Sequence, residues 1–200
     1  MMLPANGHRA HGFSSAHFLD SDEILRELDL KGDETFMDAG CGDGHISIKL
    51  LEDYNHKGQI YAVDIYDASI EDMETYKTEN NVENLTNIEA DITEGIDGID
   101  DESIDVVLMV NVFHGFKASR KLDEAVDEFA RIIKKDGKIA IMDYKAWDVP
   151  KGPPTPVRSS PEDLEKLFNS HGLKKVYLNE EIGEDIPEGK SHFLIMFQKE

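Results

Sequence analysis

The sequence is poor in cysteine and has no long apolar run. Its 200 residues include one cysteine, Cys41, so no internal disulfide can form and a cysteine-based zinc site is excluded. No apolar run of about 18 residues is present, which argues against a membrane-spanning helix. The first residues, MMLPANGHRAHGFSS, lack the apolar core of a secretory signal. A cytoplasmic location is therefore expected.

Basic residues are scarce relative to acidic ones. The chain has 21 lysines and arginines against 42 aspartates and glutamates, which gives a formal net charge of -21. Such a surface would repel phosphate groups, so nucleic acid is not expected as a partner. The excess acid is best explained as a surface that keeps the protein in solution.

Strands and helices are expected to alternate along most of the chain. The run SIDVVLMVNV is typical of a central strand that is covered on both faces. Apolar residues from Leu122 to Ile133 then repeat at helical spacing, and this helix should end before Gly137. Seven strands are expected, at residues 34–39, 58–65, 85–92, 103–112, 137–144, 173–181 and 192–199.

This alternation predicts an α/β fold with a doubly wound, mostly parallel, Rossmann-like sheet. The last two strands have no helix between them. They should therefore form a hairpin, and the closing strand should run antiparallel to the rest.

The stretch ETFMDAGCGDGHISIKL, residues 34–50, leads from a strand through a glycine-rich turn into a helix. A phosphate-binding loop needs a lysine after its last glycine, and this turn has no such lysine. The dinucleotide fingerprint G-x-G-x-x-G begins well at Gly40 and Gly42, but its third glycine would fall on His45. The glycines instead follow G-x-G-x-G and end at Gly44.

With Asp38 before it, MDAGCGDG resembles motif I of the class I S-adenosylmethionine-dependent methyltransferases. Other landmarks fall where that family has them, since Asp64 ends the second strand and Asp91 ends the third. The segment MVNVFHGF resembles the family segment whose backbone meets the methionine end of the cofactor. The resemblance covers residues 20–145. It is nearest to the small quinone-biosynthesis-like members, and KGPP after the fifth strand also looks like a feature of that group.

The resemblance implies a role for each position. Asp38 would orient the turn and reach the methionine ammonium, and Asp64 would hold both ribose hydroxyls. Asp91 and Ile92 would read adenine, while the Asn111 carbonyl would face the ammonium. The residues implied for S-adenosylmethionine are Asp38, Gly40, Cys41, Gly42, Gly44, Asp64, Ile65, Asp91, Ile92 and Asn111. The plainer alternatives are that such acids are solvated strand ends, that Cys41 is a small buried residue and that His45 is exposed.

The sulfonium methyl group of this cofactor is already activated, so such an enzyme mainly aligns a nucleophile and excludes water. If the acceptor carries a proton, the candidate bases at the ends of the fourth and fifth strands are His114, Asp143 and Tyr144. His114 is preferred because histidine titrates near neutral pH. The alternative is that His114 only shapes the wall of a loop.

One domain is expected over residues 1–200. Residues 1–20 would form a leader or lid, residues 34–145 the cofactor-binding core, and residues 146–200 a proline-rich loop, a helix and the closing strand pair. Histidines in the leader match no standard metal site, and no metal is expected. They are His8, His11 and His17.

Three functions are compatible with these features. The first is methyl transfer to a small molecule. The second is an NAD-type oxidoreductase, and the third is a relative that binds the cofactor without catalysis and acts through a partner. A small acceptor is favoured by the charge and by the short segments left to bind it. Those segments carry Lys151 and Arg158, which either attract an anionic acceptor or belong to an ordinary crossover. Their aromatic residues, expected beside the acceptor, are Phe113, Phe116, Tyr144 and Trp147.

Overall fold

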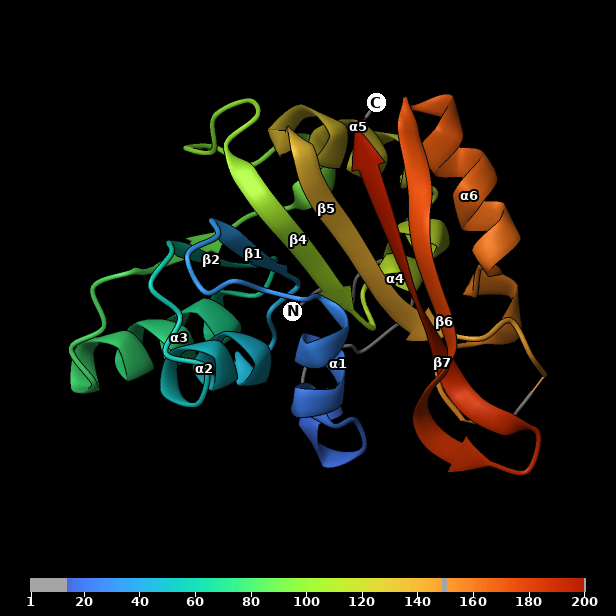
Figure 1. The fold of residues 1–200 in the computed structure, drawn as a ribbon, viewed down its shortest axis with the longest axis horizontal. Helices are drawn as coiled ribbons and strands as arrows, with labels where there is room; N and C mark the ends of the chain where they lie inside the picture. The colour runs from blue at the N-terminus through green and yellow to red at the C-terminus, as the bar shows by residue number, and fades with distance from the viewer. Residues whose placement is uncertain (1–13, 149–150, 200) are drawn as a thin grey trace.

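The computed structural model describes residues 14–148 and 151–199. These residues form a seven-stranded sheet in the order β3-β2-β1-β4-β5-β7-β6 (Figure 1). Strands β1 to β5 are parallel, and β7 is antiparallel to β5 and β6. The strands are β1 (Phe36–Ala39), β2 (Ile60–Asp64), β3 (Leu85–Glu89), β4 (Ile104–Val110), β5 (Ile133–Tyr144), β6 (Leu173–Ile186) and β7 (Gly189–Lys199). The predicted doubly wound, Rossmann-like fold with an antiparallel closing strand is confirmed.

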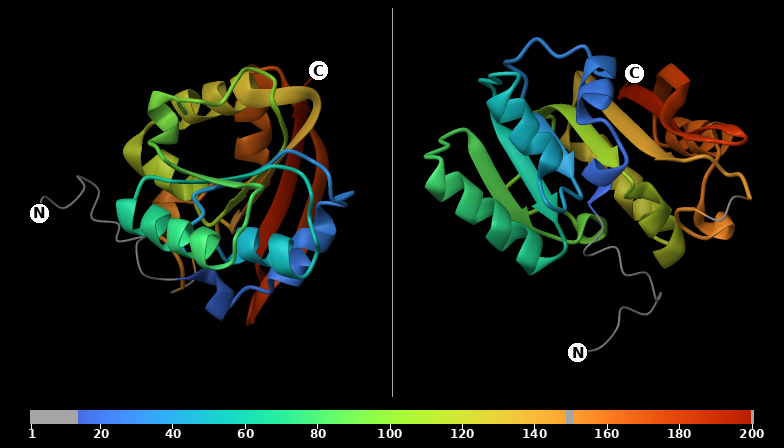
Figure 2. Two further views of the ribbon diagram at one scale, coloured as in Figure 1. Left: turned by 90° about the vertical axis from the view of Figure 1, so that its left-hand side faces the viewer. Right: turned by 90° about the horizontal axis from the view of Figure 1, so that it is seen from below.

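Helices cover both faces of the sheet (Figure 2). One face carries α1 (Ser21–Glu27), α2 (His45–Glu52) and α3 (Asp67–Glu79). The other carries α4 (Phe113–Ser119), α5 (Leu122–Ile132) and α6 (Pro161–Ser170). The described residues also form the short 3-10 helices η1 (Ser15–His17), η2 (Ile92–Glu94) and η3 (Thr155–Val157).

Strand β4 shows why its apolar run is continuous. Val107 and Met109 lie in the core under α5, while Val106 and Leu108 lie in the core under α1 and α2. Since β4 is next to β1, and β2 and β3 lie on the far side of β1, the strand order reverses between β1 and β4. In doubly wound sheets, ligands bind outside the carboxyl ends of the strands at this reversal.

The boundary between α5 and β5 differs from the prediction. The helix ends at Ile132, and Ile133 already has extended backbone and pairs with Ile104. An isoleucine at this position suits the buried side of a helix and of a strand equally well, so periodicity alone placed Ile133 wrongly. Gly137 lies inside β5, where a Cβ would press on the Asp105 carbonyl. Helix α4 was not predicted, because it is short and follows β4 with little polar interruption.

The closing hairpin follows the prediction, but β6 extends to Ile186. β7 brings Phe193 opposite Asp143 and His192 opposite Tyr144 in β5, which places the start of the last strand beside the end of β5. Ser160 is the N-cap of helix α6, and its side chain forms a capping box with Asp163.

Within the described ranges, no helix is long and apolar enough to cross a membrane. Of the expected leader, residues 14–20 are described and include η1. His8 and His11 lie outside the described residues.

Candidate active site

Three glycines with positive φ form the turn between β1 and α2. The φ values are +81° at Gly40, +55° at Gly42 and +74° at Gly44, a region that residues with a Cβ rarely adopt. A Cβ at Gly40 would overlap the side chain of Val112, so glycine lets the ends of β1 and β4 approach each other. A Cβ at Gly42 would meet no atom within 4 Å. The backbone at Gly42 therefore faces open space that a ligand can occupy.

Asp64, at the end of β2, is joined to this turn. Its Oδ2 accepts a hydrogen bond from the Gly42 amide at 2.8 Å, and its Oδ1 accepts one from the Tyr66 amide at 3.0 Å. The next residue, Ile65, is 55% exposed although it is apolar. This end of β2 thus offers carboxylate oxygens for hydroxyl groups and an apolar surface for a flat ring.

Asp38 lies in β1 just before the turn and is buried. Its Oδ2 accepts a hydrogen bond from the Ser47 hydroxyl at 2.8 Å, which links β1 to the first turn of α2. Burial raises the pKa of Asp38 to about 6, although the Ser47 hydrogen bonds oppose this, and the nearby charge of Asp64 adds to the rise. Asp38 is therefore half protonated near pH 6 when no cation lies beside it.

Asp91 and Cys41 have evident structural roles. Asp91 caps η2, where its Oδ1 accepts hydrogen bonds from the Thr93 amide at 3.0 Å and the Thr93 hydroxyl at 2.5 Å. Lys121 Nζ lies 3.7 Å from the other carboxylate oxygen, and Ile92 is buried. Burial raises the pKa of the Cys41 thiol far above its usual range, so Cys41 fits the alternative of a compact buried residue.

His45, the first residue of α2, is half-buried rather than exposed. Its Nε2 lies 2.7 Å from the Ser15 hydroxyl and its Nδ1 lies 2.9 Å from the Ser21 hydroxyl. Burial lowers its pKa. His45 therefore ties η1 and the start of α1 to the helix that follows the glycine turn.

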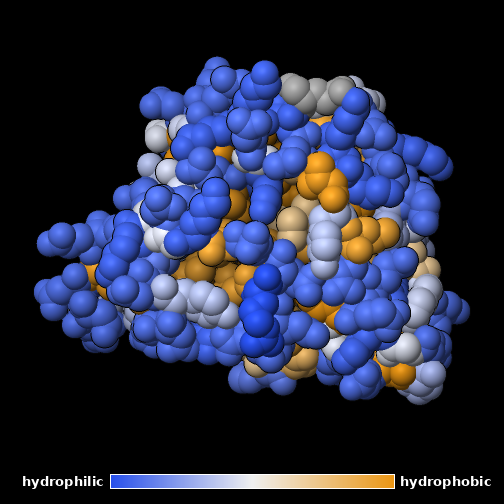
Figure 3. All heavy atoms as spheres, in the orientation of Figure 1, coloured by the Kyte–Doolittle hydropathy of each residue, from blue (hydrophilic) through white to orange (hydrophobic). Residues whose placement is uncertain are grey.

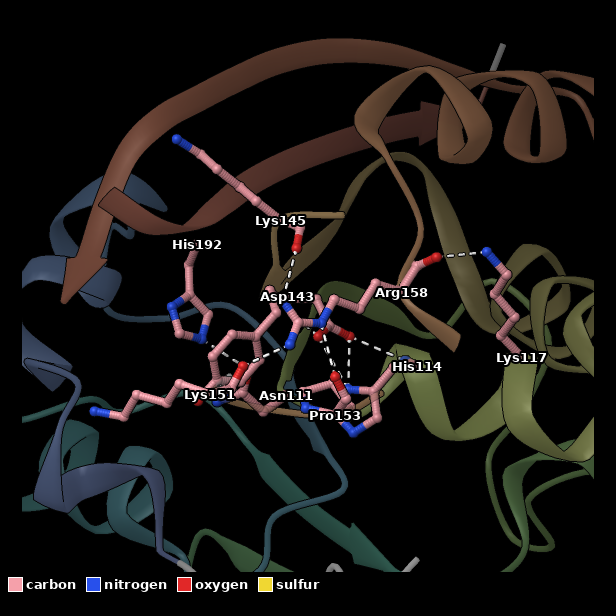
Figure 4. A network of polar contacts seen from close by, with 10 residues as sticks. Asn111, His114, Lys117, Asp143, Lys145, Lys151, Pro153, Arg158 and His192 are labelled. Carbon is pink, nitrogen blue, oxygen red and sulfur yellow. Dashed lines mark hydrogen bonds and ion pairs between the residues drawn. The ribbon is translucent and has the colours of Figure 1, made fainter. Parts of the chain in front are cut away.

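His114 and Asp143 form a buried pair at the ends of β4 and β5 (Figure 4). His114 Nδ1 lies 3.0 Å and 3.1 Å from the two carboxylate oxygens. The amides of His114 and Tyr144 also donate to this carboxylate, at 3.0 Å and 2.8 Å. Burial by itself would raise the pKa of Asp143, but His114 and these amides outweigh burial and lower it. An ionised Asp143 keeps the proton of the imidazole on Nδ1, which leaves Nε2 as the basic nitrogen.

His192 was not predicted as a site residue. It is fully buried and packs against Tyr144 in a tilted arrangement, with ring centroids 4.1 Å apart. Backbone lies directly against both rings, because a Cβ at Gly152 would overlap Tyr144 and one at Gly183 would overlap His192. Burial, together with the charge of Glu184, raises the pKa of Tyr144 to about 12. Tyr144 therefore stays a neutral phenol near neutral pH and is a weaker candidate base than His114.

Asn111 follows β4 and has a φ of +59°. Its amide donates a hydrogen bond to the Met142 carbonyl at 2.9 Å, and its Oδ1 lies 3.0 Å from Nε2 of His192. Asn111 thus stands between the glycine turn of β1 and the His114–Asp143 pair.

The structure favours one of the two alternatives for Arg158, and it buries Phe113, one of the aromatic residues expected beside the acceptor. Arg158 does not face an acceptor, because its buried guanidinium donates to backbone carbonyls of the loop, among them Pro153 at 2.8 Å and Trp147 at 2.9 Å. Phe113 is buried in the core and packs edge-on against Phe116, with ring centroids 5.8 Å apart. Arg158 therefore stabilises the loop after β5, and the two phenylalanines stabilise the packing of α4.

A family model described as a methyltransferase domain matches residues 30–190. This chain belongs to that family. The class I S-adenosylmethionine-dependent methyltransferase suggested by the glycine turn is thereby confirmed, and the NAD-type oxidoreductase is set aside. The quinone-biosynthesis-like subgroup is not distinguished by this match.

Solved structures share the fold of this chain, and a curated relative shares part of its sequence. An S-adenosylmethionine-dependent methyltransferase from Aquifex aeolicus has a TM-score of 0.76 at 22% identity, with 92% of each chain covered. The [4+2]-cyclase SpnF has a TM-score of 0.70 at 14% identity, with 90% of this chain and 79% of the cyclase covered. At these identities the likeness shows the fold alone. A curated relative, the tRNA(Thr) (cytosine(32)-N(3))-methyltransferase of Saccharomyces cerevisiae, is 29% identical over 122 residues. The match covers 58% of this chain but 19% of that protein.

The cofactor of this methyltransferase is S-adenosylmethionine, and the glycine turn fits it. Gly42 presents its backbone to open space, while Asp64 and Ile65 combine a carboxylate with an apolar surface. Asp38 supplies a further carboxyl group just before the turn.

A dependence of cofactor binding on pH is expected from Asp38. A cationic ammonium beside this carboxyl group favours its ionised form, so binding should release a proton when Asp38 starts protonated. Because the pKa of Asp38 without ligand is about 6, affinity for S-adenosylhomocysteine should be constant above that pH and fall below it. Calorimetric titrations from about pH 5 to about pH 8 measure this.

The matched variant is Asp38→Asn, which keeps an oxygen for the Ser47 hydroxyl but cannot ionise. It should bind more weakly at neutral pH and lose the decline below pH 6. The pKa of Asp38 is higher in the folded protein than in the unfolded chain, so ionisation of Asp38 destabilises the ligand-free fold as the pH rises through about 6. Asp38→Asn cannot ionise, and its melting temperature at neutral pH should therefore be higher than that of the parent. An unchanged pH profile in the variant would assign the proton to another group.

Proposed function

We propose that this methyltransferase transfers the methyl group of S-adenosylmethionine to a small-molecule acceptor, with His114 as the base. The observation that carries the proposal is the buried hydrogen-bonded pair of His114 with Asp143 at the carboxyl ends of β4 and β5. Buried pairs of a carboxylate and an imidazole are common where a histidine must be held in one tautomer. Here the pair lies beside the strand reversal where a cofactor would bind.

The residues of this chain would hold the cofactor along the ends of β1, β2 and β4. Asp64 would accept the ribose hydroxyls, and Ile65 would lie against adenine. The Asn111 carbonyl would face the methionine ammonium, with Asp38 nearby. The backbone of the glycine turn, at Gly40, Cys41, Gly42 and Gly44, would follow the methionine and ribose. Asp91 and Ile92 would read the edge of adenine, in addition to their role in η2.

When bound, the cofactor supplies a methyl group on a good leaving group, so the protein has to position the acceptor and manage its proton. Asp143 holds the Nδ1 proton of His114 and fixes the orientation of the ring. His114 Nε2 would take a proton from an oxygen, nitrogen or sulfur of the acceptor as that atom bonds to the methyl group. Tyr144, which remains neutral, would donate a hydrogen bond rather than accept the proton.

Several observations favour a small acceptor. The net charge of -21 opposes a nucleic acid, and Figure 3 shows hydrophilic residues over most of the visible face. The yeast tRNA methyltransferase shares only a segment with this chain, so its substrate is not transferred here. The proposal extends to a cytoplasmic enzyme of the quinone-biosynthesis-like subgroup, which is supported by the single cysteine and by KGPP after β5.

A second candidate is a cofactor-binding relative that transfers no methyl group. The similarity to the cyclase SpnF favours keeping it, because a protein named for another reaction has the same fold. The buried His114–Asp143 pair is harder to explain under this alternative, since binding alone needs no base.

The test is transfer of labelled methyl from S-adenosylmethionine into a metabolite extract, with total RNA and denatured protein as competing acceptors. We expect label in the small-molecule fraction. Label in RNA or protein with none in small molecules would contradict the acceptor class. Cofactor binding without transfer to any of the three would favour the non-catalytic alternative.

A further inference from the structure

A continuous chain of hydrogen bonds runs from the closing hairpin to the end of β4. The Glu184 amide lies 3.0 Å from the Ser191 hydroxyl, which lies 2.6 Å from Nδ1 of His192. Nε2 of His192 lies 3.0 Å from Oδ1 of Asn111. His192 and Asn111 come from β7 and from the residue after β4, and Figure 4 shows their side chains turned toward one another.

The direction of each hydrogen bond follows from its donors. The Glu184 amide can only donate, so the Ser191 oxygen accepts from it. The one hydroxyl proton of Ser191 is then directed at Nδ1 of His192, which must accept. A neutral His192 therefore carries its proton on Nε2 and donates it to Oδ1 of Asn111. The opposite order would give the Ser191 oxygen two donors and leave its own proton without an acceptor among the residues that the structure describes.

His192 has little freedom to leave this arrangement. Its side chain is fully buried, and burial lowers its pKa to about 4, so it stays neutral near neutral pH. The Tyr144 ring packs against it at a tilt of 41°, and Gly183 lies so close to Nδ1 that a Cβ there would overlap it. Phe18, from the segment that follows η1, stacks on the His192 ring, with centroids 6.4 Å apart.

Asn111 is the last residue in this series of hydrogen bonds, and it belongs to the proposed cofactor site. Its φ of +59° lies in the left-handed region, which asparagine adopts more readily than most residues with a side chain. The Met142 carbonyl accepts from its amide at 2.9 Å, and His192 holds its side chain. Together they fix which way the Asn111 carbonyl and side-chain amide point.

We propose that His192 is a positioning residue that acts through Asn111 to set the end of β4 for the methionine end of the cofactor. This inference rests on the proposed cofactor site. It assigns a function to a residue of the last strand, far in sequence from the glycine turn. The Ser191 hydroxyl is part of the same hydrogen-bonded arrangement because it determines the tautomer of His192.

A double-mutant cycle with S-adenosylhomocysteine as the probe tests this inference. His192→Phe and Asn111→Gly should each weaken binding by about tenfold, as expected for the loss of one buried hydrogen bond. Glycine keeps the positive φ accessible, so Asn111→Gly removes only the side chain. If His192 acts through Asn111, the double variant should bind about as well as either single one. Additive losses, or wild-type affinity for His192→Phe, would overturn the inference.

Two further variants separate positioning from a general effect on folding. His192→Gln keeps an N–H donor near Nε2 and should restore most of the affinity. His171→Gln is the matched control, because His171 bonds Asp123 and Asp127 on α5, in a different part of the molecule. It should bind like the parent. Equal losses in His192→Gln and His192→Phe would point to packing alone and contradict the inference.

The tautomer provides a readout that does not depend on binding or on the stability of the variants. Nitrogen-15 NMR of the parent chain should show His192 protonated on Nε2 and unprotonated on Nδ1. Ser191→Ala should allow the other tautomer to appear. A parent spectrum that shows the His192 proton on Nδ1 would contradict the proposed direction of these hydrogen bonds. A parent that binds no S-adenosylhomocysteine would instead remove the cofactor site on which the inference rests.

Discussion

Replacing His114 by alanine is expected to slow methyl transfer by about a hundredfold or more at neutral pH, within the range that a positioned base contributes. The imidazole is buried and its Nδ1 is held at 3.0 Å from Asp143, so water cannot replace it in the same orientation. The measurement is the initial rate of label transfer into the small-molecule fraction. Affinity for S-adenosylhomocysteine should change little, because the base faces the acceptor rather than the cofactor.

Two further variants test whether the loss of rate comes from the base itself. Asp143→Asn should lower the rate in the same direction, because an amide can donate to Nδ1 and favour the wrong tautomer. His171→Ala removes a histidine from the opposite end of the sheet and should leave the rate unchanged. If His114→Ala transferred methyl as fast as the parent, the base role would be wrong. The small-molecule acceptor would still stand.

The second large effect is expected at Asp64. Charge-assisted hydrogen bonds to ribose hydroxyls contribute roughly 1.5–3 kcal/mol each, so Asp64→Ala should weaken S-adenosylhomocysteine binding at least about tenfold. The structure adds a reason for a larger loss. The same carboxylate accepts the Gly42 amide at 2.8 Å, so its removal also releases the glycine turn.

Asp64→Asn divides these two contributions, since the amide oxygen can still accept from Gly42 but the negative charge is gone. It should bind more tightly than Asp64→Ala and more weakly than the parent. Asp72→Ala, on the exposed side of α3, is the matched control and should bind normally. Calorimetry measures affinity, and thermal melting confirms folding. Unchanged affinity in Asp64→Ala would mean that Asp64 is only a strand end.

The parts of the fold that the sequence predicted are those set by local patterns. The apolar run of β4 and the alternation of strands and helices report burial directly, and two strands without a helix between them can only pair as a hairpin or lie apart. Ile133 was misplaced because it suits both a helix and a strand. Ile133 lies in β5 because it pairs with Ile104 of β4, and a pattern read from neighbouring residues does not show a pairing between such distant positions.

The same distinction applies to the site. Gly40, Gly42 and Asp64 could be predicted because the residues next to them in the sequence identify the turn and the strand end in which they lie. The role of His192 could not be predicted from the sequence, because its position opposite Tyr144 depends on the register of an antiparallel hairpin that contains bulges. The sequence left two roles open for Arg158 for a related reason. Its charge alone does not show that several backbone carbonyls of its loop point inward and accept hydrogen bonds from it.

The most direct test of the account is calorimetric titration of the parent chain with S-adenosylhomocysteine and, separately, with NADH. The glycine pattern, the open space at Gly42 and the carboxylate of Asp64 predict that S-adenosylhomocysteine binds and that NADH does not. Binding of NADH with no response to S-adenosylhomocysteine would contradict the account.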